Sequence, residues 1–494
     1  MKTIYSPLGL IISAFLTGLA HQPLHLGWLA WFSLLPLIFV FDRIKELRHF
    51  VISGIIWGFI YYLTVIFWIA GNIGTTPLIG FLSMIVSVVF LTLNIVAVSF
   101  LMGILKKLYP QTWFWLFPLV WISMEYFRSK GSLGFPWTSL ANTQLDFLTL
   151  IQNAEIVGIY GISFWIIAVN ILLFNYLVRP YPKNSFKTIF TFILPWLTGL
   201  WLTPHAQTAH VADLDVALIQ PNIHLDQKRK PGSVQNNIVS LLNDSKPAIE
   251  KNVDLIVWPE SSISSYVLQG NDYLLEWIQG KLKNSKLISG IPYYLGEKLE
   301  RKFYNSAVLI QSDSVKNIYH KIKLVPMAEY IPISDYFSSL KELKLGQANF
   351  THGTDYTIMD VNKIKCAVMI CFESTFPSLS RQFVLNGAEV LIYLVNDGWY
   401  ENAPEPQQHA KQVIYRAIEN RRPVIRCTNT GISMVVDAGG NISHELPLNK
   451  AGMIEASIHP QNTATFYTRY GDIFARLNIL FSLLFIIGGI IRKK

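Results

Sequence analysis

Long apolar runs without charged residues constrain this chain more than any other feature of its sequence. The run from Ile85 to Ile104 contains no charged side chain, and a helix of this length crosses about 30 Å of hydrocarbon. A membrane helix satisfies its own backbone hydrogen bonds, which favours spans over soluble core helices. The sequence predicts about eight spans, at residues 6–21, 25–41, 50–70, 77–102, 112–127, 158–178, 188–203 and 473–491. We expect the first span, which follows Lys2, to be retained rather than cleaved as a signal peptide.

The charged residues divide the chain into three parts. Only 15% of its 494 residues are charged, 51% are hydrophobic, and the net charge is +9. Residues 1–203 contain 11 Lys and Arg against 5 Asp and Glu, residues 204–470 contain 26 of each, and residues 471–494 contain 4 against 1. We therefore expect a membrane domain at 1–203, a neutral globular domain at 204–470, and a last span with a basic tail at 471–494. This composition excludes a disordered chain and a basic nucleic-acid-binding protein, and three cysteines exclude a disulfide scaffold.

The basic residues of the short loops predict the orientation of the spans. Lys and Arg concentrate in cytoplasmic loops, and here they follow the second, fourth and sixth spans, at Arg43, Lys45, Arg48, Lys106, Lys107, Arg179, Lys183 and Lys187. Only Arg128 and Lys130 blur this alternation. We expect both termini in the cytoplasm and residues 204–470 on the outer side. A transporter would need polar groups inside its spans, but Glu125 and Glu155 lie only at predicted span edges.

The outer part has the pattern of a layered α/β domain. Apolar, β-rich runs occur at Asp215–Gln220, Asp254–Trp258, Leu287–Pro292, Ser306–Ile310, Lys365–Ile370, Glu389–Val395, Val424–Cys427 and Ser433–Val436. Helical patterns fall between them at about 233–251, 271–284, 378–387 and 408–420. Strands that alternate with helices indicate a layered α/β fold, and runs without polar residues indicate strands buried on both faces. We find no phosphate-binding loop, zinc-ligand spacing or serine nucleophile elbow.

Three of the predicted strands end in residues suited to covalent catalysis. Glu260 follows an apolar strand and Pro259, which fixes the turn. Lys321 and Lys323 lie between a Tyr-His pair and a Leu-Val-Pro segment, and Cys371 ends the strand 365–370. A nucleophilic thiolate needs a proton acceptor and a nearby cation. Glu260 can act as the proton acceptor. The residues alone leave open whether Lys321 or Lys323 is the cation.

These motifs resemble the Glu–Lys–Cys triad of the nitrilase, or carbon–nitrogen hydrolase, superfamily. The resemblance rests on Trp258-Pro259-Glu260, on Lys321 with Leu324-Val325-Pro326, and on Cys371-Phe372-Glu373. It implies an α-β-β-α sandwich. With the predicted spans, nearly the whole chain resembles the apolipoprotein N-acyltransferase family, and Gly134-Phe135-Pro136-Trp137 and Asn396-Asp397-Gly398-Trp399-Tyr400 support the match.

The resemblance also implies roles for further residues. The family's catalytic lysine stands eight residues before a glutamate, which selects Lys321 with Glu329. Glu329, Glu373 and Asn305 are then expected to support the active site. The chain departs from the family pattern at Lys323, which replaces a histidine, and at Met327-Ala328 and Phe372.

The family resemblance implies an acyl transfer through a Cys371 thioester. The expected donor is a membrane phospholipid, phosphatidylethanolamine, and the expected acceptor is the N-terminal amine of a diacylated bacterial apolipoprotein. We expect a monomer in the bacterial inner membrane with its catalytic domain in the periplasm, without metal, organic cofactor or nucleic-acid partner. The alternatives are a membrane-tethered nitrilase-type amidase and a transporter with an outer ligand-binding domain.

Overall fold

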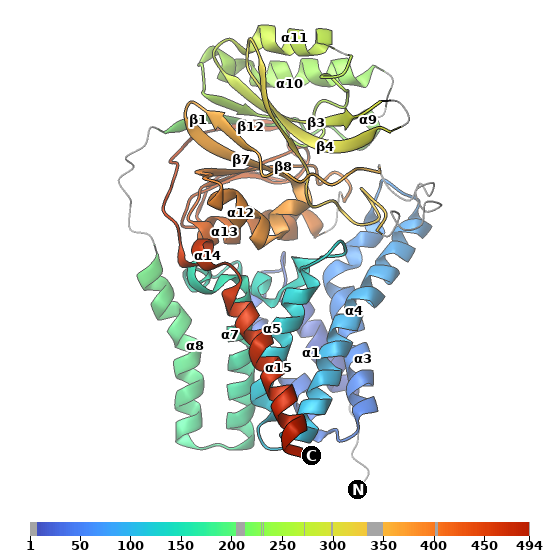
Figure 1. Cartoon of the computed structure of the whole chain (residues 1–494), viewed down its shortest axis with the longest axis vertical. Coiled ribbons are helices and arrows are strands. Elements are labelled where there is room, and N and C mark those ends of the chain that lie inside the picture. The colour runs from blue at the N-terminus through green and yellow to red at the C-terminus, as the bar shows by residue number, and fades with distance from the viewer. Residues whose placement is uncertain are drawn as a thin grey trace. The chain divides into compact units, whose positions relative to one another are not determined.

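The chain divides into a helical unit and an α/β unit in the computed structural model. The helical unit contains residues Met1–Gly71, Thr76–Thr203 and Tyr470–Lys494, and the α/β unit contains Asn72–Thr75 and Pro204–Arg469. The structure describes residues 7–203, 213–228, 230, 232–270, 272–297, 300–332, 349–400 and 404–493. The predicted combination of apolar helices with an α/β domain is confirmed (Figure 1).

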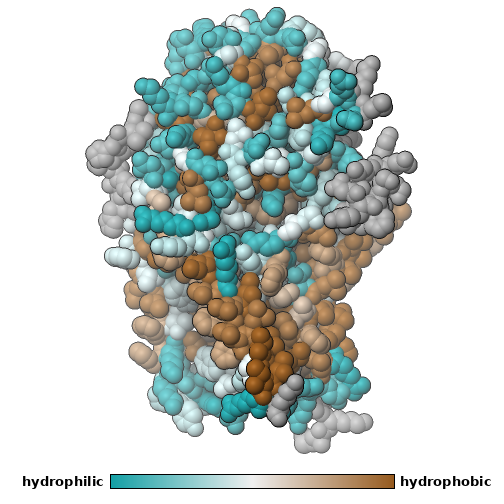
Figure 2. Space-filling model, in the orientation of Figure 1, coloured by the Kyte–Doolittle hydropathy of each residue, from teal (hydrophilic) through white to brown (hydrophobic). Residues whose placement is uncertain are grey.

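The helical unit contains five described helices that are long and apolar enough to span a membrane. These are α3 (Leu47–Ile66, extended by a 3-10 turn to Gly71), α4 (Pro77–Leu108), α7 (Ala154–Val178), α8 (Pro182–Leu202) and α15 (Ile473–Lys493). Their outer faces carry large exposed apolar side chains, such as Val86 and Leu93 on α4 and Leu484 on α15. Figure 2 shows this apolar covering over α15, and an apolar outer surface is what a lipid environment requires.

Three of the eight predicted spans correspond to shorter apolar helices in the part of the chain that the structure describes. The first becomes α1 (Pro7–Leu19), an apolar helix of 13 residues. The second is divided into a 3-10 turn (Gly27–Trp31) and α2 (Leu35–Arg43), with Pro36 in the first turn of α2. The fifth is divided into a 3-10 turn (Trp113–Leu116) and α5 (Phe117–Arg128), with Pro118 in the first turn of α5. Proline favours a helix start because it has no N–H to donate to a preceding turn.

A non-α-helical segment connects α5 to α7. It contains two 3-10 turns, Pro136–Thr138 and Leu140–Gln144, and the short helix α6 (Leu148–Ile151). Helix α7 then begins with a kink at Gly158, whose φ of 62° suits a residue without a Cβ. Most side chains from Pro136 to Gln144 are buried, so protein rather than lipid surrounds this irregular backbone.

The α/β unit contains two six-stranded sheets. The first has the order β12-β1-β2-β3-β4-β5 and the second β11-β10-β9-β8-β7-β6. Strands β1, β2 and β3 are parallel, as are β7, β8 and β9. The bounds are β1 Leu214–Gln220, β2 Leu255–Val257, β3 Lys286–Leu295, β4 Lys302–Ile310, β5 Val315–His320, β6 Ile358–Val361, β7 Ile364–Ile370, β8 Val390–Val395, β9 Val424–Thr428, β10 Ser433–Val436, β11 Ile442–Leu446 and β12 Gly452–Ile458.

Helices cover the outer face of each sheet, which confirms the predicted α-β-β-α sandwich. Helices α10 (Ser233–Glu250) and α11 (Asp272–Leu282) cover the first sheet, and α12 (Pro377–Leu385) and α13 (Glu405–Asn420) cover the second (Figure 1). The short helices α9 (Leu225–Lys228) and α14 (Phe466–Tyr470) lie outside these layers. The two inner faces pack against each other, since the Cys427 thiol on β9 donates to the carbonyl oxygen of Val257 on β2 at 3.2 Å.

Candidate active site

The structure brings Glu260, Lys321 and Cys371 together at the ends of three strands. Glu260 follows β2 and Lys321 follows β5 in the first sheet, whereas Cys371 follows β7 in the second. Lys321 Nζ lies 3.5 Å from Glu260 Oε1, and both charges lie close enough to the Cys371 thiol to change its pKa. Because the site is assembled from both sheets, it depends on the packing of the whole sandwich.

The structure also distinguishes the two lysines. The Lys321 side chain is only 1% exposed and lies among carboxylates. Lys323 is half-buried, and its Nζ lies 5.4 Å from the ring centre of Phe376. A buried ammonium must be paired or hydrogen bonded to remain charged. Lys321 meets this condition at the candidate site.

Glu329 and Asn305 form the next layer around Lys321. Glu329 Oε1 accepts hydrogen bonds from Lys321 Nζ and Asn305 Nδ2, both at 2.9 Å, and its Oε2 accepts one from the Val325 amide at 2.8 Å. Asn305, on β4, also donates from Nδ2 to Glu260 Oε1 at 2.8 Å. The Asn305 amide and the Lys321 ammonium therefore hold the carboxylates of Glu260 and Glu329 in place.

Glu373 has different neighbours from the other predicted site residues. Its Oε1 accepts hydrogen bonds from the amides of Ile322 and Lys323 and from the Tyr319 hydroxyl, at 2.7, 2.9 and 2.7 Å. Its Oε2 accepts one from the Ile370 amide at 2.7 Å. Glu373 thus connects the loop that carries Lys321 to the strand end that carries Cys371, and it is completely buried.

Burial and neighbouring charges set the protonation of the three central groups. Burial raises the pKa of Glu260, against the opposing effect of Lys321. Burial and the nearby Glu260 raise the pKa of the Cys371 thiol well above its ordinary value. Burial alone would lower the pKa of Lys321, but Glu329 and Glu260 raise it. The resting site therefore holds a lysine cation and a protonated thiol beside a glutamate that can accept its proton.

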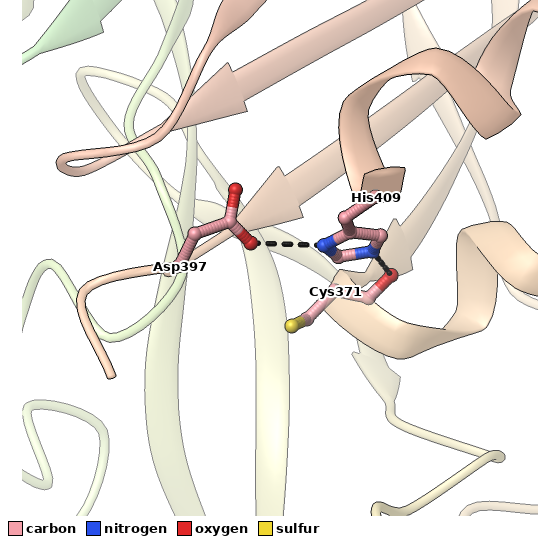
Figure 3. A group of neighbouring side chains, drawn as sticks. All are labelled: Cys371, Asp397 and His409. Carbon is pink, nitrogen blue, oxygen red and sulfur yellow. Dashed lines mark hydrogen bonds and ion pairs between the residues drawn. The ribbon is translucent and has the colours of Figure 1, made fainter. Parts of the chain in front are cut away.

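A second hydrogen-bonded group lies beside Cys371, and the sequence analysis did not place it at the site. Figure 3 shows Asp397, from the loop after β8, on one side of the His409 ring, and the Cys371 carbonyl oxygen on the other. His409 Nδ1 lies 2.8 Å from Asp397 Oδ1, and His409 Nε2 lies 3.2 Å from the Cys371 oxygen. The available signal was the position of Asp397 two residues after the entirely apolar strand β8.

This group contains atom types that bind metals, but its hydrogen bonds already occupy them. One possible ligand atom from each of Cys371, Asp397 and His409 lies within 4.8 Å of the other two. His409 Nε2 also contacts Ser374 Oγ at 2.9 Å, and Arg426 donates to Asp397 Oδ2 at 2.8 Å. Both ring nitrogens have partners and a guanidinium neutralises the carboxylate. The arrangement is a hydrogen-bond network rather than a preformed cation site.

Two family models match this chain in succession. Residues 13–172 match the apolipoprotein N-acyltransferase N-terminal domain, and residues 215–467 match carbon-nitrogen hydrolase. The apolipoprotein N-acyltransferase of Geobacter metallireducens is 31% identical over 94% of this chain and 91% of its own. The chain belongs to the apolipoprotein N-acyltransferase family. The Thermotoga maritima family member is 29% identical over 95% of this chain and 91% of its own. Among solved structures, Saccharomyces cerevisiae Nit3 of the nitrilase superfamily covers 52% of this chain and 93% of its own, with 21% identity and a TM-score of 0.40.

Membership of the apolipoprotein N-acyltransferase family makes this chain a membrane-embedded acyltransferase. The helical part itself matches the family's N-terminal domain, so the family assignment does not depend on the α/β unit alone. A transporter with an attached binding domain and a tethered amidase would not require this particular helical domain. The family assignment therefore favours acyl transfer over both alternatives considered from the sequence.

Proposed function

We propose that this acyltransferase moves an acyl chain from a membrane phospholipid to the N-terminal amine of a diacylated apolipoprotein, through a thioester on Cys371. The observation that carries the mechanism is the buried cluster in which Lys321 Nζ lies 3.5 Å from Glu260 Oε1 and both charges act on the pKa of the Cys371 thiol. It joins a potential nucleophile, a base and a cation, as covalent acyl transfer requires.

In the first half-reaction, Glu260 takes the proton of the Cys371 thiol. The sulfur attacks the ester carbonyl carbon of the phospholipid, most simply that of the sn-1 chain of phosphatidylethanolamine. A carbon–sulfur bond forms, and the carbonyl electrons move to oxygen. When the tetrahedral intermediate collapses, the carbon–oxygen bond to the glycerol breaks, and Glu260 returns its proton to the leaving oxygen. The products are a lysophospholipid and an acyl-enzyme.

Lys321 stabilises the negative charge that develops in this step. Its pKa is raised by Glu329 and Glu260, so it is a cation throughout the accessible pH range. A buried, fixed cation near a developing oxyanion acts more strongly than one in water, because water does not screen it. Hydrogen bonds from Asn305 and to Glu329 hold Lys321 and Glu260 in position for this role.

In the second half-reaction, the uncharged amine of the apolipoprotein attacks the thioester carbon. Glu260 accepts a proton from the amine, a carbon–nitrogen bond forms, and the carbon–sulfur bond breaks. The departing sulfur takes the proton from Glu260, which restores the thiol. The net reaction exchanges an ester for an amide, and it needs no cofactor.

We also propose the cellular placement that the charges of the short loops favour. Residues 1–203 and 471–494 form the membrane part, and residues 204–470 form the periplasmic catalytic part of an inner-membrane monomer. Both substrates carry acyl chains, so a membrane-bound enzyme meets them at high local concentration. Exclusion of water from the buried site protects the thioester from hydrolysis.

Mass spectrometry of the acyl-enzyme tests this proposal directly. Full-length protein incubated with phosphatidylethanolamine should gain the mass of one acyl chain on the Cys371 peptide, and a diacylated lipopeptide should remove it. Cys371→Ala should abolish both changes. The matched control is Cys366→Ala, which removes a buried thiol from β7 five residues earlier. Acylation that survives in Cys371→Ala would disprove the thioester mechanism.

A further inference from the structure

The backbone at Cys371 has an unusual conformation that needs support from its surroundings. Its φ of 53° lies in the left-handed region, which is unfavourable for residues with a Cβ. Strand β7 ends at Ile370 and a 3-10 turn begins at Cys371, so this conformation turns the chain away from the strand at the nucleophile. Such a conformation persists where neighbouring groups hold both flanking peptide units.

Different side chains hold the two sides of this turn. On the strand side, Glu373 Oε2 accepts a hydrogen bond from the Ile370 amide at 2.7 Å. On the other side, His409 Nε2 lies 3.2 Å from the Cys371 carbonyl oxygen and 2.9 Å from Ser374 Oγ. Figure 3 shows that the Cys371 side chain turns away from the imidazole ring while its carbonyl oxygen points toward it. His409 therefore contacts the backbone of the nucleophile and leaves its sulfur free to react.

The His409 ring is fixed by charged groups from three elements. Nδ1 lies 2.8 Å from Asp397 Oδ1, after β8, and 3.5 Å from Glu405 Oε1, on α13 itself. Arg426, on β9, binds the other oxygen of Asp397 at 2.8 Å. Burial alone would raise the pKa of Asp397, but Arg426 and His409 lower it to about 2. An ionised Asp397 therefore accepts the Nδ1 proton and determines the orientation of the ring.

The other ring nitrogen of His409 contacts two groups of the turn. A carbonyl oxygen only accepts hydrogen bonds, so Nε2 binds the Cys371 oxygen when it carries a proton, and Ser374 Oγ is its second partner. A ring nitrogen of His409 also lies within 4.8 Å of the Cys371 sulfur. The ring is therefore placed against both the backbone and the side chain of the nucleophile.

We propose that His409 is a positioning residue for acyl transfer, which holds the left-handed turn at Cys371 and thereby aims the sulfur at Glu260 and Lys321. The inference rests on the proposed function for its reaction. It adds a network of Asp397, His409 and Arg426 that contacts the backbone of the nucleophile. This network is separate from the cluster of Glu260, Lys321 and Glu329. His409 touches the nucleophile's backbone and not the substrate.

The rate of Cys371 alkylation by iodoacetamide, measured by peptide mass from pH 6 to pH 10, tests this role without any lipid substrate. His409→Phe keeps an aromatic ring but removes both hydrogen bonds. We expect the rates of alkylation and of acyl-enzyme formation to fall by about 10- to 100-fold, because a small misplacement of a reacting group reduces a rate by this factor. Alkylation should be slower across this pH range, while the KM for phospholipid stays unchanged. His409→Gln retains a donor near the carbonyl and should recover most of the rate.

Two further variants keep the test decisive. His444→Phe changes an exposed histidine on β11 and should behave as the wild type. Asp397→Asn removes the charge that orients His409 and should slow alkylation as His409→Phe does, which covers the case in which His409→Phe does not fold. A folded His409→Phe or Asp397→Asn protein that is alkylated at the wild-type rate would overturn the inference. Failure of wild-type Cys371 to take an acyl chain would instead refute the proposed function, because alkylation still reports the position of the sulfur.

Discussion

The two units of this protein use buried charged residues in different ways. In the helical unit, Arg128 donates to the Phe135 carbonyl oxygen at 3.3 Å and to the Tyr62 hydroxyl at 3.0 Å. Glu125 Oε1 accepts from the Leu140 amide at 2.9 Å and from Trp121 Nε1 at 3.1 Å. In the α/β unit, by contrast, Lys321 contacts two carboxylates directly.

This difference separates structural from chemical uses of buried charge. Non-helical backbone at membrane depth needs hydrogen-bond partners inside the protein. Glu125 and Arg128 supply such partners to the segment between α5 and α7. In the α/β unit Glu373 also accepts hydrogen bonds from backbone amides. Glu260 and Lys321, by contrast, contact other side chains, which suits them to act on a reacting group. The comparison predicts which substitutions reduce the reaction rate and which reduce stability.

The largest effect is expected from Lys321→Met. This change removes the cation and leaves Glu260 and Glu329 as neighbouring carboxylates without it, so acyl-enzyme formation should fall by about 10²- to 10³-fold. Single-turnover acylation by phosphatidylethanolamine measures the loss. Lys323→Met is the matched control and should retain most of the rate. Equal losses in the two variants would contradict the assignment of Lys321.

A smaller effect, on stability, is expected from Glu373→Gln. The glutamine amide would face donors that now bind the carboxylate, so at least one buried amide loses its acceptor. The free energy of unfolding should fall by about 2–3 kcal/mol. Thermal unfolding in one detergent measures this loss, with the exposed Glu300→Gln as the control. An unchanged melting temperature would show that Glu373 does not hold the two loops together.

A similar or smaller loss of stability is expected from Arg128→Met in the helical unit. Without Arg128 the Phe135 carbonyl oxygen and the Tyr62 hydroxyl each lose a donor, at a cost of about 1–3 kcal/mol. The alkylation rate of Cys371 in the folded protein should not change, because Arg128 does not act on the nucleophile. Arg179→Met, at an exposed arginine, is the control. A slower alkylation in Arg128→Met would break the distinction between the two units.

The smallest effect is a shift in pH dependence from Asn305→Ala. The base must be ionised to act, so the acylation rate rises with pH through the pKa of Glu260, which burial raises above its ordinary value of 4.5. The Asn305 hydrogen bond opposes that rise. Its removal should therefore raise the pKa further and move the acidic limb of kcat/KM to higher pH. Asn284→Ala, at an exposed residue, should leave the limb in place, and a downward shift in Asn305→Ala would contradict this role.

The elements that the sequence predicted best are those in which one physical signal dominates. Strand β8 is apolar throughout, and β7 is apolar except at the exposed Lys365, because these strands are buried on both faces. The candidate residues were identifiable because Cys371 directly follows β7 and Glu260 lies three residues after the apolar strand β2. The edge strand β11, by contrast, has mostly half-buried or exposed residues, and sequence periodicity does not distinguish it from a loop.

Other features depend on contacts that sequence patterns do not contain. The predicted spans at 25–41 and 112–127 are apolar enough, but proline and buried side-chain partners allow their chains to break into short helices. His409 lies within a predicted helix, at a position that looks like any polar helical residue. Only the packing of α13 against the ends of β7 and β8 brings it to Asp397 and to the Cys371 backbone.

Helix α4 has a consequence for the lipids around it. Its 32 residues correspond to about 48 Å of helix, and its first charged residues, Lys106 and Lys107, lie in the last turn. To fit within about 30 Å of hydrocarbon, such a helix would need a tilt of about 50°, whereas membrane helices tilt by roughly 0–40°. Even at a tilt of about 40°, α4 is longer than the hydrocarbon is thick. At least one end of this helix therefore reaches the polar headgroup region.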